Sequence, residues 1–176
     1  QTITASRDEL NREIAERKQA EETLHRLGWA VESASDAIGM ADVTGQSIYH
    51  NRAFIELFGY PVDELNAAGG PTVIYTAPDV AREVFDTIMK GDSWSGEVGM
   101  QTRPGREVVV FLRANSIKDD EGKITGLVGI HTDITERKRM EEALQESEKR
   151  YRKLFEDSPV SLWEEDFSAV KSYADE

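Results

Sequence analysis

The stretch "DDEGKITGLVGIHTDITERK", residues 119–138, decides the fold. It opens with an acidic turn, continues as an alternating apolar run from 124 to 132, and passes into a charged helical pattern at Asp133. The Asp133 carboxylate is placed to cap the free N–H groups of that helix, and Glu136 three residues later completes the pattern of a capping box. The sequence therefore predicts a strand that continues into a helix without a flexible linker.

The residues before this stretch contain further strand and helix patterns. Extended segments are expected at 38–42, 47–50, 94–102, 107–117 and 124–132, and short helices at 52–58, 61–65 and 77–90. Asn51 precedes the first of these helices as a favourable N-cap, and Gly59 can end it. Two strands, several small helices, three strands and an exit helix make up an α+β domain of about 100 residues.

The charged helix has a close copy near the start of the chain. "DITERKRMEEAL" spans 133–144 and "EIAERKQAEETL" spans 13–24, with seven identical residues at a shift of 120 positions. Such a shift is typical of tandem domains, because solenoid repeats have periods of roughly 20–50 residues. The end of the chain, 157–176, resembles the region after the first copy, so we expect a second domain to begin there.

Apolar residues recur at steps of three and four along both helices, in the same register. The seam positions are Ile3, Leu10, Ala20, Leu24, Leu27, Val31 and Ala34 in the first helix and Met140, Leu144, Ser147, Tyr151 and Leu154 in the second. This seam predicts a coiled coil and hence a parallel homodimer. An amphipathic helix packed on its own domain is the alternative.

Composition excludes several classes of function. The 34 acidic and 21 basic residues give a net charge of −13, which argues against nucleic acid as a partner because phosphate binding needs a basic surface. There is no cysteine, which excludes disulfides, zinc–thiolate sites and cysteine nucleophiles. No apolar run approaches the ~20 residues of a membrane span, and the first residues do not form a signal peptide. We therefore expect a cytoplasmic location without membrane contact, within a full-length protein that could itself be membrane-anchored.

No pattern in this chain indicates catalysis. The histidines are His25 in the first helix, His50 at the end of a strand and His131 in the last strand. No Ser–His–acid set and no carboxylate pair with the spacing of a glycosidase stands out. We expect neither an enzyme activity nor a metal site here, and no kinase or cyclase output motif is present.

Three segments of the sequence resemble the PAS domain family. They are "NRAFIELFGYPVDEL" (51–65), "GDSWSGEV" (91–98) and, most specifically, the opening stretch, whose Asp-Ile-Thr at 133–135 is the signature with which these domains pass into a signalling helix. The resemblance covers about 30–138. It implies an α+β PAS fold, with a five-stranded antiparallel sheet in the order 2-1-5-4-3 and short helices on one face.

The same resemblance implies a domain organisation and a function. The chain divides into an N-terminal coiled-coil helix (1–29), a PAS sensory domain (30–134), a connector helix (135–156) and the truncated start of a second PAS domain (157–176). PAS domains are sensory and dimerisation modules, commonly in tandem upstream of histidine kinases, diguanylate cyclases or transcription regulators. The implied role is a sensor in a two-component system, most often a sensor histidine kinase. The implied partners are a second copy of the chain, the adjacent PAS and output domains, and a small molecule.

We expect an apolar cavity and a coupling segment next to it. Similarity to flavin-binding PAS domains turns Leu127, Gly129 and His131 toward the cavity. The expected lining is Ile38, Met40, Phe54, Val84, Ile88, Met100, Val110, Leu112, Leu127 and His131, although large side chains such as Phe54 and Met100 could instead fill the core. Asp133, Ile134 and Thr135 are expected to couple the domain to the exit helix.

Three hypotheses for the ligand remain open: a small metabolite, no ligand in a dimerising spacer, and FAD in a redox sensor. Having no cofactor is the favoured expectation. Trp94-Ser95-Gly96 and His131 are similar to features of FAD-binding PAS domains, but Met100 stands where those proteins usually have Asn, and Val110 offers no hydrogen bond. The helix at 77–90 lacks the histidine of haem-binding relatives, and the absence of cysteine excludes the photo-adduct chemistry of light-sensing relatives.

Overall fold

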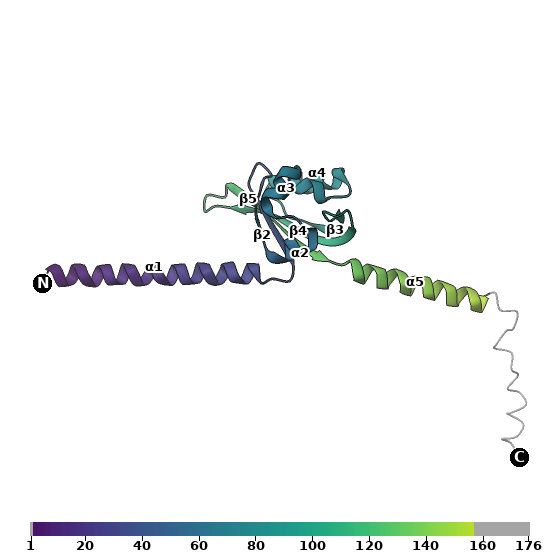
Figure 1. Ribbon diagram of the computed structural model, residues 1–176, viewed down its shortest axis with the longest axis horizontal. Helices are drawn as coiled ribbons and strands as arrows, with labels where there is room; N and C mark the ends of the chain where they lie inside the picture. Colours follow the sequence, from purple (N-terminus) through teal and green to yellow (C-terminus); the bar gives the residue numbers. More distant parts are fainter. Residues whose placement is uncertain (1, 157–176) are drawn as a thin grey trace, which may run out of the picture. The chain divides into compact units, whose positions relative to one another are not determined.

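The computed structural model describes residues 2–156, in which five strands form one antiparallel sheet (Figure 1). The strands are β1 (Ala37–Ala41), β2 (Ser47–His50), β3 (Trp94–Gln101), β4 (Glu107–Lys118) and β5 (Ile124–Asp133). Their order in the sheet is β2-β1-β5-β4-β3. The predicted α+β class and strand order are confirmed. Residues 157–176, expected to begin a second domain, lie outside the described residues.

Short helices between β2 and β3 cover one face of this sheet. They are α2 (Arg52–Phe58), α3 (Val62–Ala68), the 3₁₀ helix η1 (Pro71–Ile74) and α4 (Pro78–Met89), while α1 (Thr2–Glu32) and α5 (Thr135–Glu156) flank the domain in sequence. Their buried residues, among them Phe58, Leu65 and Ile74, join the inward side chains of the strands in one core. The chain divides into two compact units after Thr135, so α5 lies in the second unit except for its first residue.

Strand register decides which residues face this core. Directly opposed residues share a face of the sheet, and successive residues alternate. Ala37 is paired with His131, and Gly39 with Gly129. Ala37 and Ala41 are buried, which marks their side of β1 as the inner face. By alternation, Ile38 lies on the outer face.

The side chain of Asp119 holds the turn between β4 and β5 in its conformation. The Asp119 Oδ1 atom accepts hydrogen bonds from the backbone N–H groups of Glu121 (3.1 Å) and Lys123 (2.9 Å). Gly122 has φ +81°, a conformation that glycine adopts without strain. The acidic turn thus sets the hairpin that positions β5.

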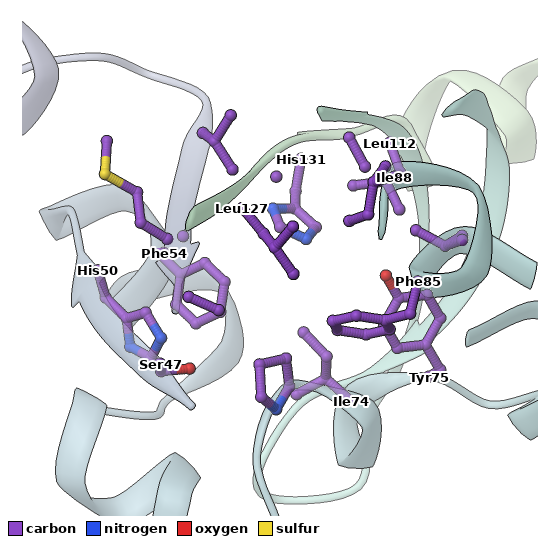
Figure 2. A pocket seen from close by; sticks show the side chains of 18 residues that line it. Ser47, His50, Phe54, Ile74, Tyr75, Phe85, Ile88, Leu112, Leu127 and His131 are labelled. Carbon is purple, nitrogen blue, oxygen red and sulfur yellow. The ribbon is translucent and has the colours of Figure 1, made fainter. Parts of the chain in front are cut away.

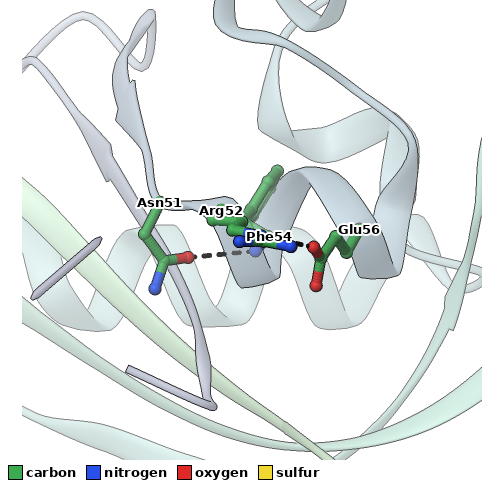
Figure 3. A network of polar contacts seen from close by, with 4 residues as sticks. All are labelled: Asn51, Arg52, Phe54 and Glu56. Atoms are coloured by element: carbon green, nitrogen blue, oxygen red, sulfur yellow. Dashed lines mark hydrogen bonds and ion pairs between the residues drawn. The ribbon is translucent and has the colours of Figure 1, made fainter. Parts of the chain in front are cut away.

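Asn51 joins four segments of the domain from a fully buried position. Its Oδ1 atom accepts a hydrogen bond from the N–H of Phe54 (2.9 Å), as an N-cap of α2 (Figure 3), and another from the N–H of Ile38 (2.8 Å) in β1. Its Nδ2 group donates to the carbonyl oxygens of Val31 and Asp36, both at 3.0 Å. The predicted N-cap is confirmed, and the same side chain also fixes α1 and β1 against α2.

Replacing Asn51 with Ala should lower the free energy of unfolding by at least about 3 kcal/mol. The lost cap accounts for about 0.5–2 kcal/mol, and each buried group left without a partner costs about 1–3 kcal/mol more. Arg52→Ala is the matched control, because it removes only the exposed ion pair with Glu56 (Figure 3) and should leave the free energy of unfolding nearly unchanged. Urea denaturation measures both, and equal effects would contradict the role given to Asn51.

Candidate functional site

A small, mostly apolar cavity of about 60 Å³ lies between the inner face of the sheet and the covering helices (Figure 2). Strands β1, β4 and β5 contribute Gly39, Leu112 and Leu127, and α4 contributes Ile88. Ser47 and His50 of β2 lie at one side of the cavity in Figure 2, and Tyr75, which follows η1, lies at the other.

Seven of the ten residues expected at the cavity line it: Met40, Phe54, Val84, Ile88, Leu112, Leu127 and His131. Ile38, Met100 and Val110 do not line it. Ile38 and Met40 share by alternation the outer face of β1, although Met40 also borders the cavity. Met100 and Val110 are fully buried and pack in the core away from the cavity. For Met100 this agrees with the alternative expectation that its side chain fills the core. Whether any of these residues binds a ligand stays a prediction.

Several residues of the cavity wall were not predicted from the sequence. Gly39, Ser47, His50, Ile74, Tyr75 and Phe85 all line it. The segment 71–75 forms η1 and then a single bridge from Tyr75 to Met100. A signal for Gly39 was available, because small residues on a central strand mark a close approach.

Two opposed glycines on the central strands make room for two rings. A Cβ atom on Gly39 would lie 3.0 Å from the Phe54 ring, and one on Gly129 would lie 2.9 Å from Cε1 of His131. The Phe54 ring stacks on the His50 ring with centroids 4.0 Å apart, and it meets the His131 ring edge-on at 5.5 Å. The glycine pair therefore lets both imidazoles pack around a single phenylalanine.

Both histidines are bound to backbone carbonyl groups. His131 Nδ1 lies 3.0 Å from the carbonyl oxygen of Ala37, and His50 Nδ1 lies 2.9 Å from that of Tyr60. Because a carbonyl oxygen only accepts, each neutral ring carries its proton on Nδ1. Burial lowers the pKa of His131 to about 4 against the opposing hydrogen bond to Ala37, and burial also lowers the pKa of His50. Both rings are therefore uncharged at neutral pH.

Tyr75 contributes a hydroxyl group without a protein partner. The residue is nine-tenths buried, and within the described part of the chain its hydroxyl makes no hydrogen bond. Burial alone raises the pKa of this hydroxyl, with no opposing hydrogen bond. Figure 2 shows the hydroxyl oxygen on the cavity side of the ring. This hydroxyl is therefore available to a bound molecule or water.

The two residues directly after β5 are hydrogen-bonded to β4, and the Asp133 side chain binds the second of them. The Ile134 N–H donates to the carbonyl oxygen of Val109 (2.9 Å), and Thr135 Oγ1 accepts from the N–H of Val109 (2.9 Å). Asp133 Oδ1 accepts from the N–H of Thr135 (2.9 Å), so its bond falls on the first residue of α5. Asp133, Ile134 and Thr135, the expected coupling residues, thus form the junction of strand and helix.

The cavity does not fit the isoalloxazine ring of FAD. Ligand pockets for drug-sized molecules measure about 300–1,000 Å³, several times the volume present here. The Trp94-Ser95-Gly96 motif has a structural role instead. Trp94 Nε1 donates to Glu83 of α4 (3.0 Å), and a Cβ on Gly96 would lie 2.9 Å from the Trp94 ring. The motif therefore fastens α4 to β3.

The model of the PAS domain family matches residues 35–136. This is more than half of the chain, and the chain belongs to that family.

Similar sequences and similar solved structures are consistent with this family. The methanogenesis regulatory histidine kinase FilI of Methanothrix harundinacea is 29% identical over 113 residues, which are 63% of this chain and 13% of that kinase. The PAS domain of a protein from Colwellia psychrerythraea is 24% identical with a TM-score of 0.55, covering 65% of this chain and 98% of that one. A domain of a sensory box sensor histidine kinase/response regulator from Geobacter sulfurreducens is 26% identical with a TM-score of 0.52, covering 64% and 94%.

Among residues 2–156 there is no helix with the length and apolarity that crossing a membrane requires. The same residues contain no cluster of metal-ligating side chains.

Acidification should destabilise the domain through His131. The folded-state pKa of about 4 lies below the ordinary value of 6.5, so the unfolded chain binds the proton first as the pH falls. The stability that neutral His131 supports is complete above about pH 6.5 and is lost between pH 6.5 and about 4. At about 1.4 kcal/mol per pH unit the loss is about 3 kcal/mol, and His50 adds to it in the same direction.

Urea denaturation across this pH range measures the slope. His131→Asn keeps an amide donor near the carbonyl oxygen of Ala37 but does not titrate, so its acid slope should be flatter. His25→Asn on the exposed face of α1 is the control and should keep the wild-type slope. An unchanged slope in His131→Asn would show that other groups cause the acid sensitivity.

Proposed function

We propose that this chain is the sensory module of a larger signal-transduction protein. A small molecule in the cavity changes the position of β5, and β5 changes the start of α5. The relatives with histidine kinase names support a kinase as the output. The matched segment is 13% of FilI, and we place the output domain elsewhere in the proposed protein.

The observation that carries this proposal is that β5 belongs to both the cavity and the junction. Leu127, Gly129 and His131 line the cavity, and the strand ends at Asp133. The next two residues, Ile134 and Thr135, bind Val109 of β4. The Ile134 N–H donates to the Val109 carbonyl oxygen, and the Val109 N–H donates to the Thr135 hydroxyl. Only one residue separates His131 from Asp133, so a displacement of the ring is transmitted along one short stretch of backbone.

The coupling is tested by Asp133→Ala in the full-length protein. Losing the bond to the Thr135 N–H should cost about 0.5–2 kcal/mol of local stability and leave the core folded. Output should then stay at one level whether or not the stimulus is present. Asp120→Ala, in the exposed turn before β5, is the matched control and should respond as wild type. A normal response in Asp133→Ala would restrict this cap to a structural role.

A parallel homodimer through α1 and α5 is part of the proposal. The apolar seam residues are well exposed in the single chain: Leu10, Leu24, Leu27, Met140, Leu144, Tyr151 and Leu154. Burial of such side chains contributes about 25 cal/mol per Å², and a second copy presents the same seam in the same register.

Sedimentation equilibrium should therefore show a mass that rises toward twice the monomer mass as the concentration increases. Leu144→Glu places a charge on the seam and should raise the dissociation constant at least about tenfold, since an unpaired charge is costly to bury. Gln145→Glu adds the same charge at the neighbouring position, off the seam, and should have little effect. A monomer at all concentrations would exclude this mode of assembly.

A ligand-free spacer is the second candidate function, favoured by the small volume of the cavity. In that case the domain relays a signal from a neighbouring domain. Native mass spectrometry of the purified protein separates the two, because only the sensory module retains a small molecule.

A further inference from the structure

We propose that the cavity binds a compact, uncharged molecule that has a small apolar body and one hydrogen-bonding group directed at Tyr75. This inference rests on the sensory function proposed above and specifies the chemical class of its ligand. It excludes carboxylates, phosphates and ammonium compounds.

The first support is the absence of formal charge around the cavity. Of the described residues that line it, none is Asp, Glu, Lys or Arg. The two histidines are the only lining groups that titrate near neutral pH, and burial keeps both uncharged there. An ionised ligand would lose its water shell without gaining an opposite charge, and such a transfer is strongly unfavourable. A neutral molecule avoids this cost.

The second support is the unpartnered Tyr75 hydroxyl. It can donate one hydrogen bond and accept others, and within residues 2–156 it does neither. On the other side of the cavity, His50 has its Nδ1 atom committed to Tyr60. Between these two polar edges lie apolar side chains, including Leu127, Ile74 and Ile88 (Figure 2). A polar group at Tyr75 and an apolar body in the middle would match both the free hydroxyl and these apolar side chains.

Cavity volume limits the size of the ligand. The cavity of about 60 Å³ is less than half of an engineered apolar cavity of about 150 Å³ that holds benzene. The ligand is therefore smaller than a benzene ring, and a nucleotide, flavin or haem is far outside this range.

Two probes of the same shape test whether the cavity excludes charged molecules. Acetamide and acetate have nearly the same size, and only acetate is charged. In titrations of isotopically labelled protein followed by NMR, acetamide should shift the backbone signals of Gly39 and Gly129 in a saturable manner. It should bind at least about tenfold more tightly than acetate. Equal binding of acetate, or no saturable shift with either probe, would overturn the proposal.

Variants locate the hydrogen-bonding group. Tyr75→Phe removes a hydroxyl that stabilises nothing in the free protein, so the domain should stay folded and the affinity for acetamide should fall about three- to tenfold. Tyr49→Phe is the matched control, because that hydroxyl binds Glu32 on α1 (2.7 Å) and does not line the cavity. Acetamide binding that is insensitive to Tyr75→Phe would remove Tyr75 from the site.

A cavity-filling variant tests the location independently. Gly129→Ala places a methyl group against the His131 ring and should abolish acetamide binding; unaltered binding in the folded variant would place the probe elsewhere. Failure of the ligand class is separable from failure of the sensory function. A charged molecule retained by the native protein would overturn the class and support sensing. Saturable acetamide binding with a normal response in Asp133→Ala would support the class and contradict the proposed coupling.

Discussion

The four hydrogen bonds of Asn51 are the constraint on which the rest of the domain depends. One buried amide uses both of its donors and two acceptor positions, and each partner is a backbone group of a different segment. Buried polar groups specify a unique arrangement only when all of them are satisfied. Asn51 meets that condition and therefore fixes where α1 ends, where β1 begins and how α2 starts.

The same constraint builds the cavity wall. His50 precedes Asn51, and Phe54 donates its N–H to the Asn51 side chain. These two rings stack on each other, and the Phe54 ring also contacts His131 on β5. Gly39, next to the capped residue Ile38, leaves the space that the Phe54 ring fills. The cap at Asn51 thus helps to position the rings of His50, Phe54 and His131, which belong to three elements. Only the cap itself could be predicted from neighbouring residues in the sequence.

The fold could be predicted from the sequence to the extent that its signals are local. The strand of 124–132, the helix start near Asp133 and the cap at Asn51 each depend on a few neighbouring residues. Which residues of a short strand face the core is harder to predict, because an error of one residue exchanges the two faces. Ile38 was assigned to the wrong face in this way. Met100 and Val110 were placed on the correct face, but their distance from the cavity depends on the packing of helices from elsewhere in the chain. Tyr75 was missed because η1 has no periodic pattern, and its role arises only from tertiary packing.

Thr132 affects the free energy of the end of β5 that leads into α5. Its Oγ1 atom is buried and has no hydrogen-bond partner in residues 2–156. It lies between His131, which lines the cavity, and Asp133, which binds the first residue of α5. An unsatisfied buried hydroxyl costs about 1–3 kcal/mol, and coupling free energies between sites are typically of the same size, about 1–3 kcal/mol. A shift of β5 that brought a partner to Thr132 would recover part of this cost. In the proposed sensor, two positions of the strand would then differ by little in free energy, and the differential affinity of a small ligand would select between them.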